Sequence, residues 1–146
     1  MIGRGENLIV FAGKLNSTKG FDKFTTALKK ILKKYINWKA VAIGDEPREK
    51  INFKHKNFKF TGWISHQKVL DYYKKSSITI VPSYWEEPFG RSSLEAASRG
   101  NAVILSNRGG LPETINNPIF LKKITSNEIF LEVDKLIKNP KILNQF

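Results

Sequence analysis

Short runs of apolar residues alternate with helical patterns from one end of this 146-residue chain to the other. Residues 8–12, 40–43, 78–81 and 102–105 are apolar at almost every position. A strand with one solvated face alternates polar and apolar residues, whereas a strand that is apolar throughout is buried on both faces. The pattern therefore predicts a parallel sheet covered by helices on both sides, which is the doubly wound α/β class.

Two weaker segments, 57–61 and 118–121, bring the expected sheet to about six strands. Helices are expected near 21–35, 65–73, 92–98 and 125–137, and Ser65 is placed to cap the second of them. Thr125 and Glu128 have the spacing of a capping box at the start of the last. A chain of this length suits one domain, so we expect residues 1–146 to form a single domain with a Rossmann-like sheet.

The loops that follow the expected strands hold most of the distinctive residues. Ligands of parallel α/β sheets bind outside the carboxyl ends of the strands, where the strand order reverses. In chain order these loops contain Gly13-Lys14, Gly44-Asp45, Gly62-Trp63, residues 83–90 and Gly109-Gly110. A ligand site is therefore expected at this edge of the sheet.

The loop after the first strand runs from Gly13 to Gly20 and contains Lys14 and Lys19. Glycine lets the backbone approach a ligand, and two lysines beside a helix start favour an anion such as a diphosphate. The loop matches neither the P-loop nor the dinucleotide fingerprint. The structural alternative is that Gly13 only ends a strand and Lys19 is only solvated.

The loop after the fourth strand places Glu87 and Glu95 on either side of Gly90, near the start of a helix. Carboxylates accept from sugar hydroxyls, and the free amides of a helix start donate to phosphate, so this arrangement suits a ligand that is part sugar and part phosphate. The alternative is a capping box, because Ser92 and Glu95 also have that spacing.

The stretch Trp63-Ile64 offers a backbone edge and an indole to a nucleobase, with core packing of Trp63 as the alternative. The chain has no cysteine and only two histidines, His55 and His66, neither with a partner at metal-ligand spacing. No Asp-x-Asp motif occurs. We therefore expect no metal site and no cofactor.

The formal charge of +12 has two interpretations. A basic protein binds nucleic acid, an anionic membrane or a phosphorylated substrate. Alternatively, the charge has no functional meaning: 20 of the 25 basic residues are lysines, a bias that an AT-rich genome produces. Lysines of this kind are commonly found on solvent-exposed helix faces. No apolar run is long enough to span a membrane and the first residues lack a signal sequence, so a soluble, cytoplasmic protein is expected.

Several motifs taken together and in order resemble a known family. They are Gly13-Lys-Leu, Lys19-Gly20, Gly44-Asp45, Gly62-Trp63, Val81-Pro-Ser83, Glu87-Pro-Phe-Gly90, Glu95-Ala-Ala-x-x-Gly100 and Gly109-Gly-Leu-Pro-Glu113. The chain resembles, over nearly all its length, the donor-binding C-terminal half of retaining GT-B glycosyltransferases of the group-1 or family-4 type. The resemblance implies a metal-independent transferase that moves a sugar from a nucleotide diphosphate sugar to an acceptor. It also implies that the N-terminal acceptor domain and the C-terminal return helices lie outside this chain, which alone would transfer little.

The resemblance also assigns roles. Lys19 would bind the diphosphate, assisted by Lys14 beside Gly13, and Glu87 would hold hydroxyls of the transferred sugar; Lys19 and Glu87 are the expected catalytic residues. Glu95 would accept from the ribose hydroxyls, the Trp63-Ile64 stretch would border the base, and amides would come from Phe89, Gly90 and Arg91. The family usually has arginine where this chain has Lys14, and lysine lacks the planar fork that binds a diphosphate with two parallel bonds.

Two partners are expected beyond the donor substrate: the missing N-terminal domain and an anionic membrane surface, to which the whole enzyme would bind peripherally at the inner face. A different class of function also fits the charge, namely a basic, non-catalytic module that binds nucleic acid or anionic surfaces. The motifs favour the transferase over nucleic-acid binding.

Overall fold

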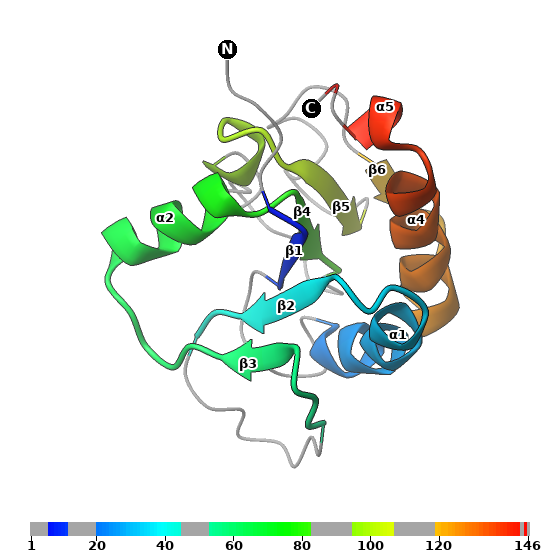
Figure 1. Ribbon diagram of the computed structural model, residues 1–146, viewed down its shortest axis with the longest axis horizontal. Coiled ribbons are helices and arrows are strands. Elements are labelled where there is room, and N and C mark those ends of the chain that lie inside the picture. Colours follow the sequence, from blue (N-terminus) through cyan, green and yellow to red (C-terminus); the bar gives the residue numbers. More distant parts are fainter. Residues whose placement is uncertain are drawn as a thin grey trace.

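The sheet has six strands in the order β3-β2-β1-β4-β5-β6, and every neighbouring pair is parallel (Figure 1). The computed structural model describes residues 6–11, 20–44, 53–82, 95–106, 119–143 and 145. The strands are β1 (Leu8–Phe11), β2 (Lys39–Ala42), β3 (Phe58–Phe60), β4 (Ile78–Val81), β5 (Ala102–Ser106) and β6 (Ile119–Leu121). This confirms the expected doubly wound, Rossmann-like α/β sheet.

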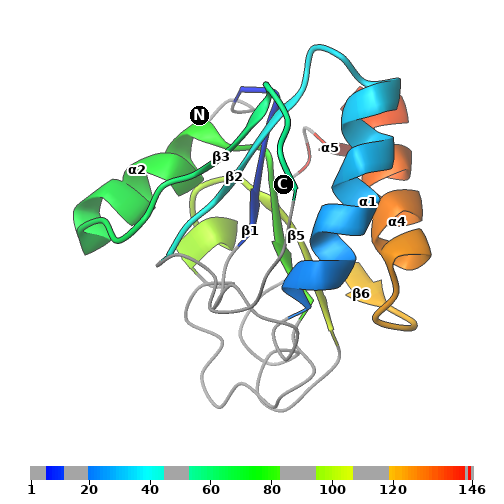
Figure 2. The same cartoon turned by 90° about the horizontal axis from the view of Figure 1, so that it is seen from below.

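The helices lie in two layers, one on each face of the sheet (Figure 2). On one face lie α1 (Phe21–Lys34), α4 (Ser126–Lys138) and the short α5 (Pro140–Leu143), and α2 (His66–Lys75) covers the other. Residues 95–97 are helical where a helix over 92–98 is predicted. Successive residues of a strand pack against opposite helical layers: Ile9 and Phe11 pack with α1, whereas Val10 packs with Tyr73 of α2. Both faces of the sheet are therefore buried, as the uninterrupted apolar runs predict.

Two predicted helix caps are present. The Ser65 hydroxyl accepts from the Lys68 amide at 3.3 Å and opens α2, and the Thr125 hydroxyl accepts from the Glu128 amide at 3.1 Å and opens α4. Each side chain satisfies one of the amides that have no partner within the helix. The sequence therefore marks where both helices begin.

A buried amide joins three elements at the amino end of β5. The Asn101 Oδ1 accepts from the Ser76 hydroxyl at 2.6 Å and the Thr79 hydroxyl at 2.9 Å, and its Nδ2 donates to the Tyr73 carbonyl at 2.6 Å. Both ends of the amide are therefore hydrogen-bonded inside the protein, where an unpaired polar group would be costly. The network connects α2, β4 and β5.

A polar clasp joins α1 to α4. Asp134 accepts from Lys34 Nζ at 2.8 Å and from the Tyr35 hydroxyl, and it pairs with Lys138 at 3.0 Å. Hydrogen bonds from Lys34 and then Tyr35 hold the pKa of Asp134 well below its usual range. Burial, with the hydrogen bond to Asp134, raises the pKa of Tyr35 to about 12. A residue on an otherwise polar position of α4 thus becomes a buried link between helices.

Candidate functional site at the carboxyl edge of the sheet

The strand order reverses between β1 and β4, which are neighbours in the sheet although the chain visits β2 and β3 between them. The backbone beyond these two strands is in close contact. Gly20, just before α1, has φ +76°, and a Cβ built there would lie 2.1 Å from the carbonyl oxygen of Pro82, which follows β4. Only glycine fits this position, so the start of α1 rests directly on the end of β4 at the switch point.

The segments after β2 and β3 are also joined at this edge. Gly44 and Gly62 form an isolated antiparallel bridge, and Gly62 has φ +69° with open space where a Cβ would stand. The bridge fixes the backbone immediately before Trp63. Two neighbouring loops are thus held together beside the expected ligand edge.

Trp63 projects from this edge into solvent with 78% of its surface exposed, and Ile64 is half-buried. The alternative in which Trp63 packs in the core is therefore wrong. An exposed indole beside a ligand edge is free to stack on a flat ring. The role of Trp63 and Ile64 toward a base stays a prediction.

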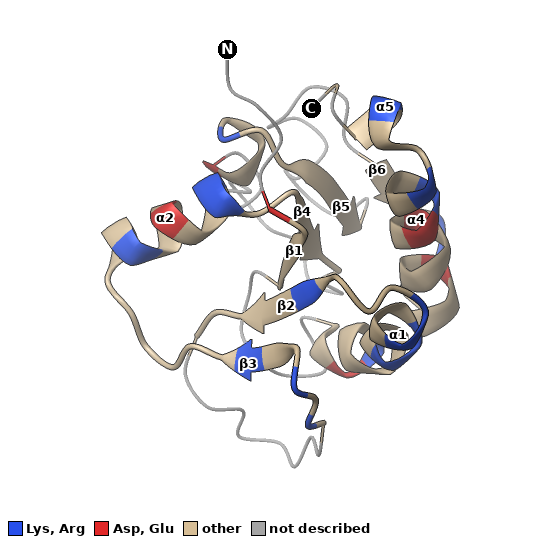
Figure 3. Cartoon of the chain, in the orientation of Figure 1, with Lys and Arg blue, Asp and Glu red and all other residues tan. Residues whose placement is uncertain are grey.

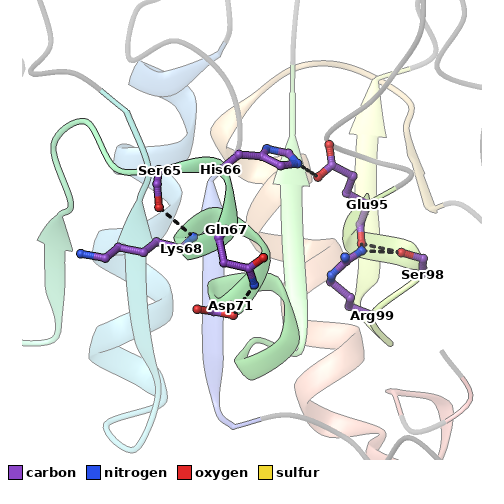
Figure 4. A network of polar contacts seen from close by, with 8 residues as sticks. All are labelled: Ser65, His66, Gln67, Lys68, Asp71, Glu95, Ser98 and Arg99. Carbon is purple, nitrogen blue, oxygen red and sulfur yellow. Dashed lines mark hydrogen bonds and ion pairs between the residues drawn. The ribbon is translucent and has the colours of Figure 1, made fainter.

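The structure brings together two side chains that the sequence does not connect, His66 and Glu95 (Figure 4). His66 is the first residue of α2, and its Nε2 lies 3.1 Å from Oε2 of Glu95. The backbone carbonyl of Glu95 accepts from the Ser98 hydroxyl at 2.9 Å and from Arg99 at 3.1 Å. Glu95 is thus held both at its backbone carbonyl and at its carboxylate, and its expected role toward ligand hydroxyls stays a prediction.

His66 was missed by sequence reasoning, which considered it only as a metal ligand. Its spacing from Glu95 carries no local signal, because the contact depends on α2 and the segment after β4 folding onto the same face of the sheet. The one available indication was its place directly after the predicted cap Ser65, in a loop that leaves the carboxyl end of a strand.

The remaining predicted site residues lie outside the described part of the chain. They are Gly13, Lys14, Lys19, Glu87, Phe89, Gly90 and Arg91. Ser92, the partner in the alternative capping box with Glu95, lies outside it as well. In the sequence, residues 12–19 stand between β1 and Gly20, and residues 83–94 stand between Pro82 and Glu95.

A second, basic surface lies away from this edge, on the coil before β3 and the C-terminal half of α1 (Figure 3). It surrounds a pocket of about 490 Å³ whose floor includes Leu32 and Phe53. Ile36 stands in its wall with 74% of its surface exposed. Its described lining includes no carboxylate, and its basic side chains are Lys29, Lys33, Lys54, His55 and Lys56.

Within the described ranges, no three His, Cys, Asp or Glu side chains gather as they would around a metal ion. In the same part of the chain, no helix combines the length and apolarity that crossing a bilayer requires.

The sequence of this chain is similar to those of known glycosyltransferases. The family model described as "Glycosyl transferases group 1" matches residues 2–146. A 2-deoxystreptamine N-acetyl-D-glucosaminyltransferase of Niallia circulans is 29% identical over 97% of this chain and 42% of its own length. A lipopolysaccharide 1,2-N-acetylglucosaminetransferase of Salmonella typhimurium is 24% identical over 96% of this chain and 42% of its own length. The chain thus spans less than half the length of these curated relatives.

Solved structures agree with the sheet and its two helical layers. The C-terminal domain of a group 1 family glycosyl transferase from Francisella tularensis superimposes with a TM-score of 0.83 at 29% identity, over 97% of this chain and 80% of that one. Anabaena HepE, solved in complex with UDP and glucose, gives a TM-score of 0.78 at 18% identity over 94% of this chain and 40% of that one. The second likeness is one of fold.

Proposed function

Because the chain belongs to the group 1 glycosyl transferases, we propose that it is the donor-binding half of a retaining, metal-independent transferase that uses a nucleotide diphosphate sugar. The observation that carries the proposal is the position of Glu95. Its carboxylate lies in the segment that follows β4, on the edge where the strand order reverses and doubly wound sheets bind their ligands. A UDP complex of a structural neighbour with the same fold supports a nucleotide ligand.

The proposed roles follow the chain around this edge. Glu95 accepts from the ribose hydroxyls, since an ionised carboxylate is an acceptor only. Trp63 and Ile64 border the base from the segment fixed by the Gly44–Gly62 bridge. Gly13, Lys14 and Lys19 serve the diphosphate from the segment between β1 and α1. Glu87 holds the transferred sugar, with amides from Phe89, Gly90 and Arg91.

In the proposed reaction the diphosphate leaves from the face on which the acceptor attacks, so negative charge grows on the leaving group. Fixed positive charges and backbone amides aimed at that charge lower the barrier more than they stabilise the bound substrate. Lys14 and Lys19, with the amides near Gly90, are the groups proposed for this task. The proposal of metal independence rests on this supply of positive charge by the chain itself.

We place the acceptor site on a second domain. This chain covers 42% of the length of a curated relative, and a structural neighbour of which it covers 80% is itself a C-terminal domain. The chain alone is therefore expected to bind the donor and to transfer little sugar. Robust transfer by residues 1–146 alone contradicts this division of the enzyme.

The test is calorimetric titration of the chain with UDP, GDP, ADP and their sugar conjugates at two salt concentrations. One nucleotide is expected to bind, and saturation at about 100 times its Kd stabilises the fold by roughly 2.7 kcal/mol, which a thermal melt detects. Glu95→Ala is expected to abolish that shift. Glu132→Ala is the matched control, because Glu132 pairs with Lys135 on α4, across the sheet from Glu95.

Loss of binding in Glu95→Ala but not in Glu132→Ala supports the donor site and identifies the base. If no nucleotide shifts the melt of the unaltered chain, the donor proposal is wrong. If Glu95→Ala binds as tightly as the unaltered chain, Glu95 has no part in the site and acts only at the start of its helix.

The basic pocket beside α1 supports a second proposed activity, binding of the enzyme to an anionic membrane surface at the inner face of the membrane in the cytoplasm. Its lysines surround the exposed Ile36, and this combination of cations around an apolar side chain suits a layer of anionic lipid headgroups. Duplex and single-stranded nucleic acids are the competing ligands, and steep loss of affinity with salt is expected for either.

A further inference from the structure

His66 covers a carboxylate oxygen of Glu95. The Oε2 atom is buried, whereas the His66 side chain in contact with it is 55% exposed. The two side chains point toward one another (Figure 4). We propose that His66 is a positioning residue of the donor site, holding the Glu95 carboxylate in place for the vicinal hydroxyls of ribose. The inference rests on the proposed function of Glu95 as the ribose ligand.

The chemistry of the contact sets its direction. An ionised carboxylate has no proton to give, so the Nε2 atom of His66 at 3.1 Å acts as the proton-bearing partner. This holds for the neutral ring with its proton on Nε2 and for the protonated ring alike. In either state the imidazole attracts Oε2 and restricts rotation of the carboxylate.

Both sides of the contact are anchored in the fold. Ser65 caps α2 and so sets where His66 begins the helix, while Ser98 and Arg99 hold the backbone carbonyl of Glu95. A side chain fixed before the ligand arrives loses less conformational entropy on binding. His66 therefore raises affinity for a ribose without needing to touch the ligand.

The neighbouring residue on α2 provides a matched control. Gln67 is exposed like His66, but its side-chain amide donates to Asp71 at 3.1 Å, one turn further along the helix (Figure 4). Gln67→Ala thus removes a side chain of similar size at the same helix start without touching Glu95. Ser65→Ala tests the remaining alternative, since it loosens the start of α2 while it leaves the imidazole in place.

The experiment measures the Kd of whichever of UDP, GDP and ADP binds, and of its 2′,3′-dideoxy counterpart. The variants are His66→Ala, His66→Gln, Gln67→Ala, Ser65→Ala and Glu95→Ala, each checked for folding by thermal melt. His66→Ala is expected to weaken the ribonucleotide about tenfold, the loss that accompanies removal of one contact to a charged group. It is expected to leave the dideoxynucleotide unchanged, because that ligand lacks the hydroxyls that Glu95 binds. His66→Gln, which keeps an N–H donor, is expected to restore most of the affinity.

The outcomes separate the inference from the proposed function. If the unaltered chain binds nucleotide and Glu95→Ala does not, the proposed function stands and His66 is judged on its own. Equal weakening of both ligands by His66→Ala, or the same loss in Ser65→Ala, shows a structural role and overturns the inference. An unchanged Kd in His66→Ala overturns it as well. If the unaltered chain binds no nucleotide, both proposals fail together.

Discussion

Two tryptophans with opposite environments show how differently single residues act in this chain. Trp38 is 5% exposed within the core against α1, whereas Trp63 stands in solvent beside the Gly44–Gly62 bridge. Composition and spacing alone do not separate them, because exposure depends on how the loop after β3 leaves the sheet. The role of each side chain follows from that difference.

We expect Trp38→Ala to lower the free energy of unfolding by about 3–5 kcal/mol, because it empties a large core volume. Trp63→Ala is expected to change it by about 0.5 kcal/mol or less, as for surface residues in general. Urea denaturation of both variants measures the difference. Comparable losses in the two would show that Trp63 packs against the protein in solution.

Two of the described glycines with positive φ, Gly20 and Gly62, provide a second pair at this scale. Gly62→Ala is expected to lower the free energy of unfolding by roughly 1–2 kcal/mol, the cost of a side chain in that backbone conformation. Gly20→Ala is expected to lower it further, because the new Cβ also meets the Pro82 carbonyl at 2.1 Å. Denaturant midpoints of the two variants test this order. Equal losses would mean that the backbone beside Pro82 gives way without cost.

At the scale of elements, most of what the sequence predicts is local. The strand predicted over 57–61 is β3 at Phe58–Phe60, and the helix predicted from the cap Ser65 is α2. Continuous apolar runs and capping residues depend on neighbours a few positions away, so they are legible in the sequence. The carboxyl edge of the sheet, where the candidate site lies, can be predicted in the same way, because it follows from where each strand ends.

Long-range relations were not predicted. The order of the strands follows from packing of whole layers, and no spacing within one strand reveals it. Asp134 is buried on α4 among apolar side chains such as Ile129 and Val133, and its partner Lys34 lies 100 residues away in the sequence. The contact between His66 and Glu95 was not predicted for the same reason, since it forms only when two segments distant in the sequence pack together.

The clasp between α1 and α4 makes stability depend on pH. The pKa of Asp134 is lower in the folded than in the unfolded chain, so its contribution is complete above about pH 4, near the carboxyl value of an unfolded chain, and is lost as the pH falls toward the folded value. Asp134→Asn is therefore expected to have a lower free energy of unfolding than the unaltered chain at pH 7. This difference in free energy is expected to become smaller as the pH falls. Urea unfolding between pH 2.5 and pH 7 measures it. A gap that is constant over this range would contradict the clasp.

Tyr35 is expected to make stability depend on pH at alkaline values as well. Its folded pKa of about 12 lies above the ordinary value of 10.0, so the folded state favours the neutral phenol. Its contribution is present below pH 10 and is lost as the pH rises toward 12. Tyr35→Phe is expected to lack this alkaline loss, which the same unfolding series extended upward detects.

At the scale of the whole molecule, part of the +12 charge gathers on one surface. The pocket beside α1 gathers lysines from two separate stretches of chain around the exposed Ile36. The proposed donor edge lies elsewhere on the molecule, so the two proposed activities use different surfaces. Each can therefore be altered without the other.

Replacement of Lys33, Lys54 and Lys56 by Gln is expected to weaken binding to anionic vesicles at least about tenfold, since each lysine near such a surface contributes about 1 kcal/mol. Replacement of Lys68, Lys74 and Lys75 by Gln changes the net charge equally on the α2 side and serves as the control. Co-sedimentation with vesicles with and without anionic lipid measures both. Equal losses would assign the affinity to net charge alone, and retained nucleotide binding in both variants confirms that the donor edge is intact.

The buried Asn101 amide has a consequence for how the sheet is assembled. Its three hydrogen bonds to α2 and β4 exist only when β5 pairs with β4 in the observed register, in which Ala102 lies opposite Ile78. A slip of β5 by one residue would turn its side chains to the opposite face and leave several polar groups without partners, at about 1–3 kcal/mol each. An apolar strand on its own has little to distinguish one alignment from the next. The hydrogen bonds of Asn101 thus favour a single register of β5. That register in turn fixes where the helical residues 95–97, which include Glu95, meet His66.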